Sequence, residues 1–169
     1  AEAVPRLGAA RATLELSHAK LLGRGSKADV FCGEFAFRPS EPTAVAFKVF
    51  KGSKSMSPDM AARIGAEAEL GARLRHPNLL RLYGMVQRPD FGVALVLEMA
   101  AAGSLRSLLD DCSQPLSWPQ RVRWLRQIAD GMCEMHSLLP AAIVHRDLRA
   151  ANVLLSADRT AKISDFGVS

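Results

Sequence analysis

Short apolar runs separated by turn residues occupy most of the first hundred positions of the chain, a pattern typical of β-strands. Two strands are expected within residues 14–35, on either side of Gly23 and Gly25. A third is expected at 43–50, where β-branched and aromatic residues concentrate, and two more begin at residues 79 and 92. The pattern therefore predicts five strands before residue 100.

One helix is predicted among these strands, from residue 57 onward. Ser57 is a suitable N-cap, a proline follows it at the first helical position, and His76 and Pro77 end the helix. Gly65 and Gly71 each weaken this helix by about 1 kcal/mol relative to alanine.

Two further helices are predicted in the second half of the chain. A short one is expected in SLRSLLDD, and a long one follows Ser117, which forms a capping-box pattern with Gln120. Four apolar residues share one face of the long helix: Val122, Leu125, Ala129 and Met132.

Strands first and helices afterwards indicate an α+β arrangement or two lobes. The chain changes character at EMAAAG, residues 98–103, so the boundary is expected there. The alanine-rich residues 1–13 are expected to form a linker. The sequence has no internal repeat.

Composition narrows the functional classes. At 169 residues, 49% hydrophobic and 23% charged, the chain matches one ordinary globular domain. A net charge of +5 without a long Lys/Arg block argues against nucleic-acid binding. No apolar run approaches the roughly 20 residues of a membrane helix. Three widely spaced cysteines, Cys32, Cys112 and Cys133, favour reduced thiols, and the cytoplasm is the default location.

The first candidate chemistry lies in the strand-rich half. Gly23 and Gly25 allow a tight hairpin whose amides can approach a polyphosphate, although an ordinary turn would explain them equally well. Lys48 lies in an apolar strand, where its charge costs desolvation unless an anion meets it or the strand is at a sheet edge. The following helix offers Glu67 and Glu69 as partners.

The stretch IVHRDLRAANVLLS, residues 143–156, places several charges between two apolar runs. Asp147 is a loop carboxylate suited to accepting a hydroxyl proton. Asn152, and Asp165 in KISDFGVS, supply the oxygen ligands that Mg²⁺ takes. Taken alone, the short fragments HRD and DFG each occur by chance too often to indicate a function.

The order of these features makes them specific. A glycine hairpin, a strand lysine, a helix glutamate, a His-Arg-Asp loop with an asparagine five residues on, and Asp-Phe-Gly follow one another as in the protein-kinase signature. From about Leu16 to Ser169 the chain resembles a protein kinase catalytic domain of the tyrosine kinase or tyrosine-kinase-like group. The resemblance implies a bilobal α+β fold. A five-stranded antiparallel N-lobe with one helix would cover 14–98, and the first part of a helical C-lobe would cover 99–169.

The resemblance implies a transfer of the ATP γ-phosphate to a protein hydroxyl, with ATP and Mg²⁺ as cofactors and a protein as substrate. Lys48 would hold the α- and β-phosphates and would be positioned by an ion pair with Glu67, which is preferred over the other helix glutamate. Asp147 would orient and deprotonate the acceptor hydroxyl, while Asn152 and Asp165 would bind Mg²⁺. No nucleic acid and no membrane span are implied, and the oligomeric state stays open.

The residues implied to contact ATP come from the hairpin, the adenine pocket, the hinge and the Asp-Phe-Gly motif. They are Leu22, Gly23, Gly25, Val30, Ala46, Lys48, Leu97, Glu98, Met99, Ala100, Leu154 and Asp165. Ala46 and Leu154 would sandwich adenine, Leu97 would be the gatekeeper, and the backbone of 98–100 would bind the adenine edge.

The acceptor amino acid stays open between tyrosine and serine or threonine. Arg149, two residues after Asp147, is similar to the Src-type tyrosine kinase loop. The long lead-in before His145 is similar to Ser/Thr enzymes of the tyrosine-kinase-like group. Tyrosine or dual specificity is slightly favoured.

Three features depart from the family pattern. Ala28 replaces the third glycine of the hairpin, Lys27 occupies its tip, and the sequence stops at Ser169, before an activation segment or an Ala-Pro-Glu motif. The resemblance thus implies an incomplete catalytic domain whose own activity is open. A pseudokinase or a non-catalytic ATP-binding regulatory module is the alternative, and the presence of all five catalytic residues argues against it.

Overall fold

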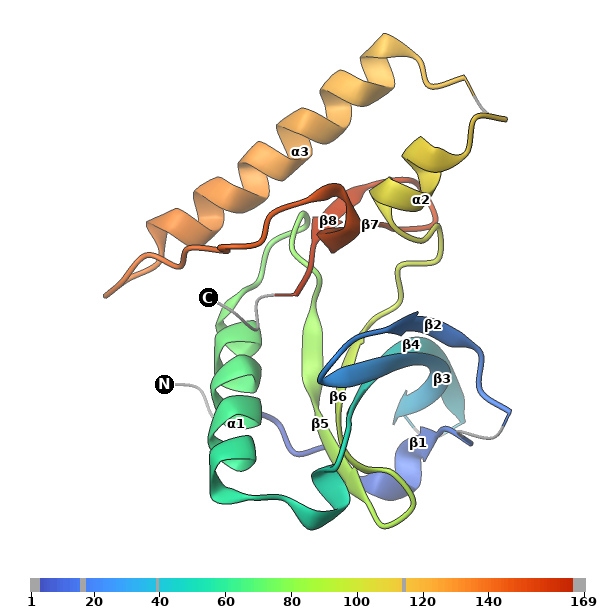
Figure 1. Cartoon of the computed structure of the whole chain (residues 1–169), viewed down its shortest axis with the longest axis vertical. Helices are drawn as coiled ribbons and strands as arrows, with labels where there is room; N and C mark the ends of the chain where they lie inside the picture. The colour runs from blue at the N-terminus through green and yellow to red at the C-terminus, as the bar shows by residue number, and fades with distance from the viewer. Residues whose placement is uncertain (1–3, 16–17, 39, 114, 166–169) are drawn as a thin grey trace. The chain divides into compact units, whose positions relative to one another are not determined.

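A computed structural model describes residues 4–15, 18–38, 40–113 and 115–165, and the chain forms two compact units (Figure 1). The first unit comprises Ala1–Arg73 and Arg81–Met99, and the second comprises Leu74–Leu80 and Ala100–Ser169. Compared with the predicted ranges 14–98 and 99–169, the residues before 14 lie in the first unit and residues 74–80 lie in the second.

The first unit is built on an antiparallel sheet. Its five longer strands are β2 (Leu21–Arg24), β3 (Ala28–Arg38), β4 (Glu41–Phe50), β5 (Leu82–Arg88) and β6 (Gly92–Glu98). These correspond to the five predicted strands, and a two-residue strand, β1 (Ala12–Thr13), adds to them. The strand order is β1-β3-β4-β6-β5, with β2 paired to β3. β5 begins later than the apolar run that starts at residue 79 because Leu79 and Leu80 belong to the second unit.

Residues 4–13, expected to be a linker, make main-chain hydrogen bonds with the sheet. The Leu7 N–H donates to Met85 O at 2.8 Å, and the Met85 N–H donates to Pro5 O at 3.0 Å. A short 3₁₀ helix, η1 (Ala9–Arg11), follows, and then Ala12 is buried against the sheet. The N-terminal segment therefore pairs with β5, which ends the strand order.

One helix, α1 (Pro58–Arg73), packs against β5 and follows the 3₁₀ helix η2 (Ser53–Ser55). The predicted cap forms, because Ser57 Oγ accepts a hydrogen bond from the Met60 N–H at 3.2 Å. Ile64 and Ala68 of α1 join a buried cluster on one face of the sheet. The strand residues alternate, so a second cluster fills the other face: Phe35, Val45, Phe47, Val86 and Val96 are among its members.

The second unit contains α2 (Leu105–Asp110), α3 (Trp118–Ser137), the 3₁₀ helix η3 (Ala150–Asn152) and a two-stranded antiparallel sheet of β7 (Val153–Leu155) and β8 (Ala161–Ile163). The predicted cap at Ser117 is present, because its Oγ accepts the Gln120 N–H, and Ser104 Oγ caps α2 in the same way by accepting the Ser107 N–H. The core of this unit is a cluster of five buried residues: Leu105, Trp124, Val153, Leu155 and Ala161.

The buried face of α3 is not the apolar face noted in the sequence. Trp124, Gly131 and Met135 are buried, whereas Val122 and Leu125 are 48% and 64% exposed. Gly131 permits this packing, because a Cβ there would lie 2.9 Å from the carbonyl oxygen of Asn78.

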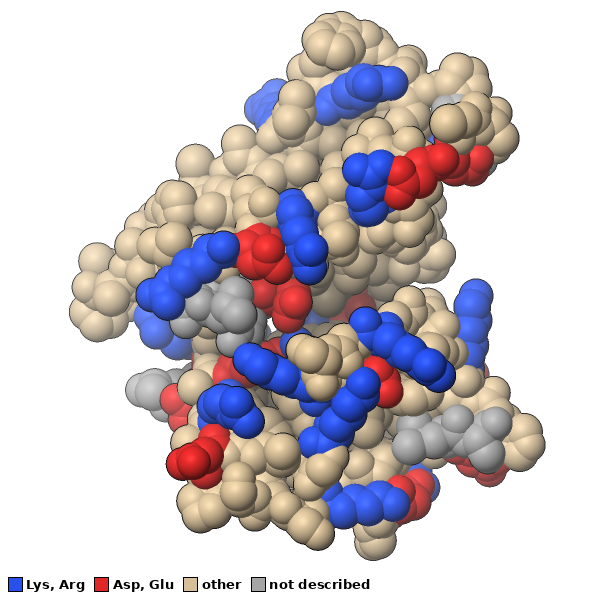
Figure 2. All heavy atoms as spheres, viewed as in Figure 1, with Lys and Arg blue, Asp and Glu red and all other residues tan. Residues whose placement is uncertain are grey.

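Charges of both signs are mixed on the face drawn in Figure 2, where Asp and Glu side chains lie among the Lys and Arg side chains. The absence of nucleic-acid binding stays a prediction. Within the described part of the chain, no helix combines the length and apolar character that crossing a membrane requires.

Candidate active site

Lys48 and Glu67 form an ion pair inside the first unit. Lys48 Nζ lies 2.6 Å from Glu67 Oε1, and each side chain is 17% exposed. β4 carries Lys48 between β3 and β6, so the alternative of an edge-strand lysine is wrong. Of the two helix glutamates, Glu67 meets the lysine and Glu69 is exposed.

The glycine hairpin joins β2 to β3, and its two glycines differ. The Gly25 N–H donates to Ala28 O at 2.9 Å, and a Cβ on Gly25 would lie 2.9 Å from that same oxygen. The turn itself therefore requires Gly25. A Cβ on Gly23 would meet no described atom within 4 Å, so packing does not demand that glycine. Ala28, at the expected third glycine, is buried in the cluster beneath α1, so its methyl group contributes to the core.

The strand residues implied to surround adenine are neighbours in the sheet. Ala46 of β4 is directly opposite Leu97 of β6, and Val30 of β3 is opposite Lys48. Glu98 ends β6, and its N–H donates to the main-chain oxygen of Arg81 at 2.9 Å. Leu22 is 39% exposed. Met99 and Ala100 follow β6, and Leu154 lies in β7 of the second unit.

The loop between α3 and η3 brings Asp147 and Asn152 into contact. Asn152 Nδ2 donates to both the main-chain oxygen and the Oδ2 atom of Asp147, each at 2.9 Å. Arg149 Nε lies 3.3 Å from the same Asp147 Oδ2. A carboxylate is therefore held between an amide donor and a cation, which fixes its orientation.

His145 supports this loop from the interior. Its side chain is buried, and its Nδ1 accepts a hydrogen bond from the Asp147 N–H at 3.3 Å. Nε2 therefore carries the proton, and it donates to Ser164 O at 2.9 Å. Ser164 in turn binds Asn152, since its N–H and its hydroxyl donate to Asn152 O at 2.8 Å and 3.0 Å.

Two residues of this site have left-handed backbone conformations. Arg146 has φ of 63° and Asp165 has φ of 67°. Aspartate adopts this region more readily than arginine, and such strained residues concentrate at functional sites. Phe166 and Gly167, which complete the Asp-Phe-Gly motif, lie outside the described residues.

The β7–β8 turn leads the chain from Asn152 back to Ser164. Hydrogen bonds from Ser156, and then from Thr160, lower the pKa of Asp158 in this turn to about 2. The carboxylate thus stays ionised and caps the turn.

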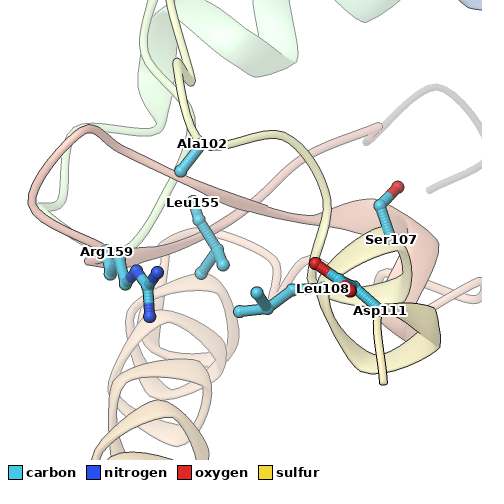
Figure 3. Close-up of a pocket in the computed structure, with 6 residues that line it drawn as sticks. All are labelled: Ala102, Ser107, Leu108, Asp111, Leu155 and Arg159. Carbon is cyan, nitrogen blue, oxygen red and sulfur yellow. The ribbon is translucent and has the colours of Figure 1, made fainter. Parts of the chain in front are cut away.

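A separate hollow of about 300 Å³ lies in the second unit (Figure 3). Six residues line it: Ala102, Ser107, Leu108, Asp111, Leu155 and Arg159. Hydrogen bonds from Ser113 lower the pKa of Asp111 on its wall. None of the residues implied to contact ATP lines this hollow.

A family model for protein tyrosine and serine/threonine kinases matches residues 16–169. The chain belongs to this kinase family. It is similar to the receptor-like cytosolic serine/threonine-protein kinase RBK1 of Arabidopsis thaliana, with 34% identity over 149 residues, or 88% of this chain and 31% of the relative. It is also similar to the probable serine/threonine-protein kinase drkC of Dictyostelium discoideum, with 35% identity over 88% of this chain and 19% of the relative. The serine/threonine-protein kinase PLK4 of Xenopus tropicalis is 34% identical over 88% of this chain and 15% of the relative. The kinase chain thus spans less than a third of the length of these relatives.

The kinase sequence motifs did not identify every residue that shapes the site. Neither the buried His145 nor Ser164 received a role from the sequence, although both lie beside residues that did. A polar residue directly before Asp165, at the end of a short apolar strand, is the signal that could have indicated Ser164.

Proposed function

We propose that this chain carries the catalytic machinery of an ATP- and Mg²⁺-dependent protein kinase. The observation that carries the proposal is the arrangement around Asp147, whose carboxylate is contacted by Asn152 at 2.9 Å and by Arg149 at 3.3 Å. A carboxylate oriented in this way can accept the proton of an acceptor hydroxyl as that oxygen attacks phosphorus.

The second-unit residues suit a magnesium ion shared with a nucleotide. Asn152 Nδ2 donates to two oxygen atoms of Asp147, so the Asn152 amide oxygen is the side-chain atom that would bind a cation. Among the described residues, no group of three His, Cys, Asp or Glu side chains could hold a metal ion by itself. Two oxygen ligands, from Asn152 and Asp165, match an ion that takes its remaining ligands from phosphate and water. The bound ion would neutralise charge on the transferred phosphoryl group.

In the first unit, Lys48 would bind the α- and β-phosphates of ATP. Glu67 holds the ammonium group at 2.6 Å and so restricts where it can lie. Gly23 leaves space beside the hairpin backbone for phosphate oxygens, and Leu22, Gly25 and Val30 would cover the nucleotide. Adenine would contact the side chains of Ala46, Leu97 and Leu154 and the backbone of residues 98–100, which includes Glu98, Met99 and Ala100.

We propose serine or threonine as the acceptor. The printed names of the three relatives describe serine/threonine kinases. These relatives outweigh the slight preference for tyrosine that Arg149 and its loop suggested.

The test is phosphate transfer by the complete protein from γ-³²P-ATP to a generic basic protein acceptor, followed by phosphoamino acid analysis. Asp147→Asn should lower kcat about 10²- to 10⁴-fold, because the catalytic carboxylate is lost. Lys48→Met should lower it by about 10²-fold or more, because the phosphate contact is lost.

Matched controls use exposed residues of the same types. Lys54→Met and Asp130→Asn should keep wild-type rates. Wild-type turnover in Asp147→Asn or Lys48→Met would refute the proposed roles. Binding of ATP without any transfer would instead favour a non-catalytic regulatory module.

A further inference from the structure

Ser164 makes an unusual set of contacts in the second unit. It lies directly before Asp165, is 7% exposed, and points two donors at one oxygen. Its main-chain N–H lies 2.8 Å from Asn152 O, and its hydroxyl lies 3.0 Å from the same atom. Asn152 and Asp165 are the two proposed magnesium ligands. Ser164, the residue before Asp165, therefore makes two hydrogen bonds to the main chain of Asn152.

The main-chain oxygen of Ser164 completes the link. It accepts the His145 Nε2–H at 2.9 Å, and the same imidazole accepts the N–H of Asp147. Through His145, the hydrogen bonds of Ser164 therefore connect to the main chain of Asp147 as well as to that of Asn152.

The hydroxyl group is the part of this arrangement that depends on the residue type. Any residue except proline could make the two main-chain contacts at position 164, but the hydrogen bond from Oγ to Asn152 O needs a hydroxyl group. A buried hydroxyl costs free energy unless it is hydrogen bonded, and alanine would fill the site without that cost. A serine here therefore calls for a role beyond filling space.

We infer that Ser164 is a positioning residue that sets the spacing between the magnesium ligands Asn152 and Asp165 through its hydroxyl group. This inference rests on the proposed kinase function. Asp165 has a left-handed backbone with φ of 67°, which few residues adopt without support from their surroundings. The three hydrogen bonds of Ser164 hold the chain immediately before this left-handed residue.

The test measures metal affinity directly, without relying on turnover. Mn²⁺ replaces Mg²⁺, ADP is held at saturation, and electron paramagnetic resonance counts the free ion in the presence of the complete protein. Ser164→Ala should weaken Mn²⁺ binding about three- to tenfold, the loss expected for one net hydrogen bond. Ser164→Thr, which restores the hydroxyl, should bind Mn²⁺ within about twofold of wild type.

Ser53→Ala is the matched control for general destabilisation. Ser53 is also buried and also makes two close hydrogen bonds, to Phe50 O at 2.7 Å and from the Val93 N–H at 2.8 Å, but it lies in the first unit. This variant should melt at a lower temperature and keep its Mn²⁺ affinity. Should Ser164→Ala fail to fold, Ser164→Cys takes its place. Its weakly donating thiol should give an affinity between those of alanine and serine.

The outcomes separate this inference from the proposed function. Unchanged Mn²⁺ affinity in Ser164→Ala, with wild-type binding intact, overturns the positioning role and leaves the kinase function standing. Equal losses in the alanine and threonine variants, or an equal loss in Ser53→Ala, overturn it as well. A wild-type protein that neither binds Mn²⁺ with ADP nor transfers phosphate overturns the proposed function itself.

Discussion

Replacing Glu67 by glutamine removes the carboxylate that lies 2.6 Å from the ammonium group of Lys48. Two unit charges at this distance attract each other by about 6 kcal/mol at an effective dielectric constant of about 20. Both side chains are only 17% exposed, so the loss of their hydration offsets a large part of this attraction. We therefore expect a net coupling energy of about 1–3 kcal/mol.

A double-mutant cycle measures this coupling. Glu67→Gln, Lys48→Met and the double variant are unfolded in urea, and circular dichroism follows the loss of structure. Each single variant should lower the free energy of unfolding by about 2–3 kcal/mol, because each removes one charge of a mostly buried ion pair. The double variant should lose less than the sum of the two.

Glu69→Gln is the control, since Glu69 is exposed on the same helix two residues further on. Its effect should stay within about 0.5 kcal/mol. Additive single effects would show that the ion pair contributes no coupling. An equal cost for the two glutamate variants would show that helix propensity or net charge, and not the contact with Lys48, sets the stability.

Three further predictions concern local structure. Gly65→Ala should raise the free energy of unfolding by about 0.5–1 kcal/mol, because a Cβ there meets no described atom within 4 Å, whereas Gly71→Ala should not, because its Cβ would meet a leucine of β5 at 3.0 Å. An equal rise in the free energy of unfolding of the two variants, measured by urea titration, would contradict this prediction. Arg146→Gly should be more stable than Arg146→Ala by about 1 kcal/mol, because φ is 63° at that position, and an alanine variant of equal stability would argue against the strain. The Asp158 carboxyl should titrate at about 2 by NMR, so its stabilising effect is present above an unfolded pKa of about 3.9 and is lost as the pH falls toward 2. Ser156→Ala should raise that midpoint, and a wild-type midpoint near 3.9 would contradict the hydrogen-bonded turn.

The parts of the fold that follow from side-chain pattern were predictable. Short apolar runs indicated β4 and β6, and the predicted caps Ser57 and Ser117 form at the helices that they precede. The N-terminal segment was not predictable in this way. Its contacts with β5 use main-chain N–H and C=O groups, which every residue type but proline offers in full, so an alanine-rich stretch gives no sign of them.

The orientation of α3 shows a second limit. The helix carries two apolar stripes, one through Val122 and Leu125 and one through Trp124 and Met135, and hydrophobic period alone does not choose between them. The deciding residue is Gly131, which lets the helix approach the carbonyl oxygen of Asn78 closely. In α3, therefore, the mid-helix glycine marks the packed face, whereas the apolar stripe through Val122 and Leu125 does not.

The candidate site shows the same contrast between side-chain features, which the sequence reveals, and main-chain contacts, which it does not. Order and spacing were enough to select Lys48, Asp147 and Asn152, because their chemistry resides in side chains that the sequence displays. Spacing also favoured Glu67 over its neighbour, and the 2.6 Å contact agrees with that choice. Several of the hydrogen bonds that hold the second-unit residues, however, end on backbone oxygens, as in the contacts between Ser164 and Asn152. A main-chain acceptor has no letter in the sequence. The proposed catalytic residues can therefore be named before the fold is known, whereas the residues that position them become visible only in the structure.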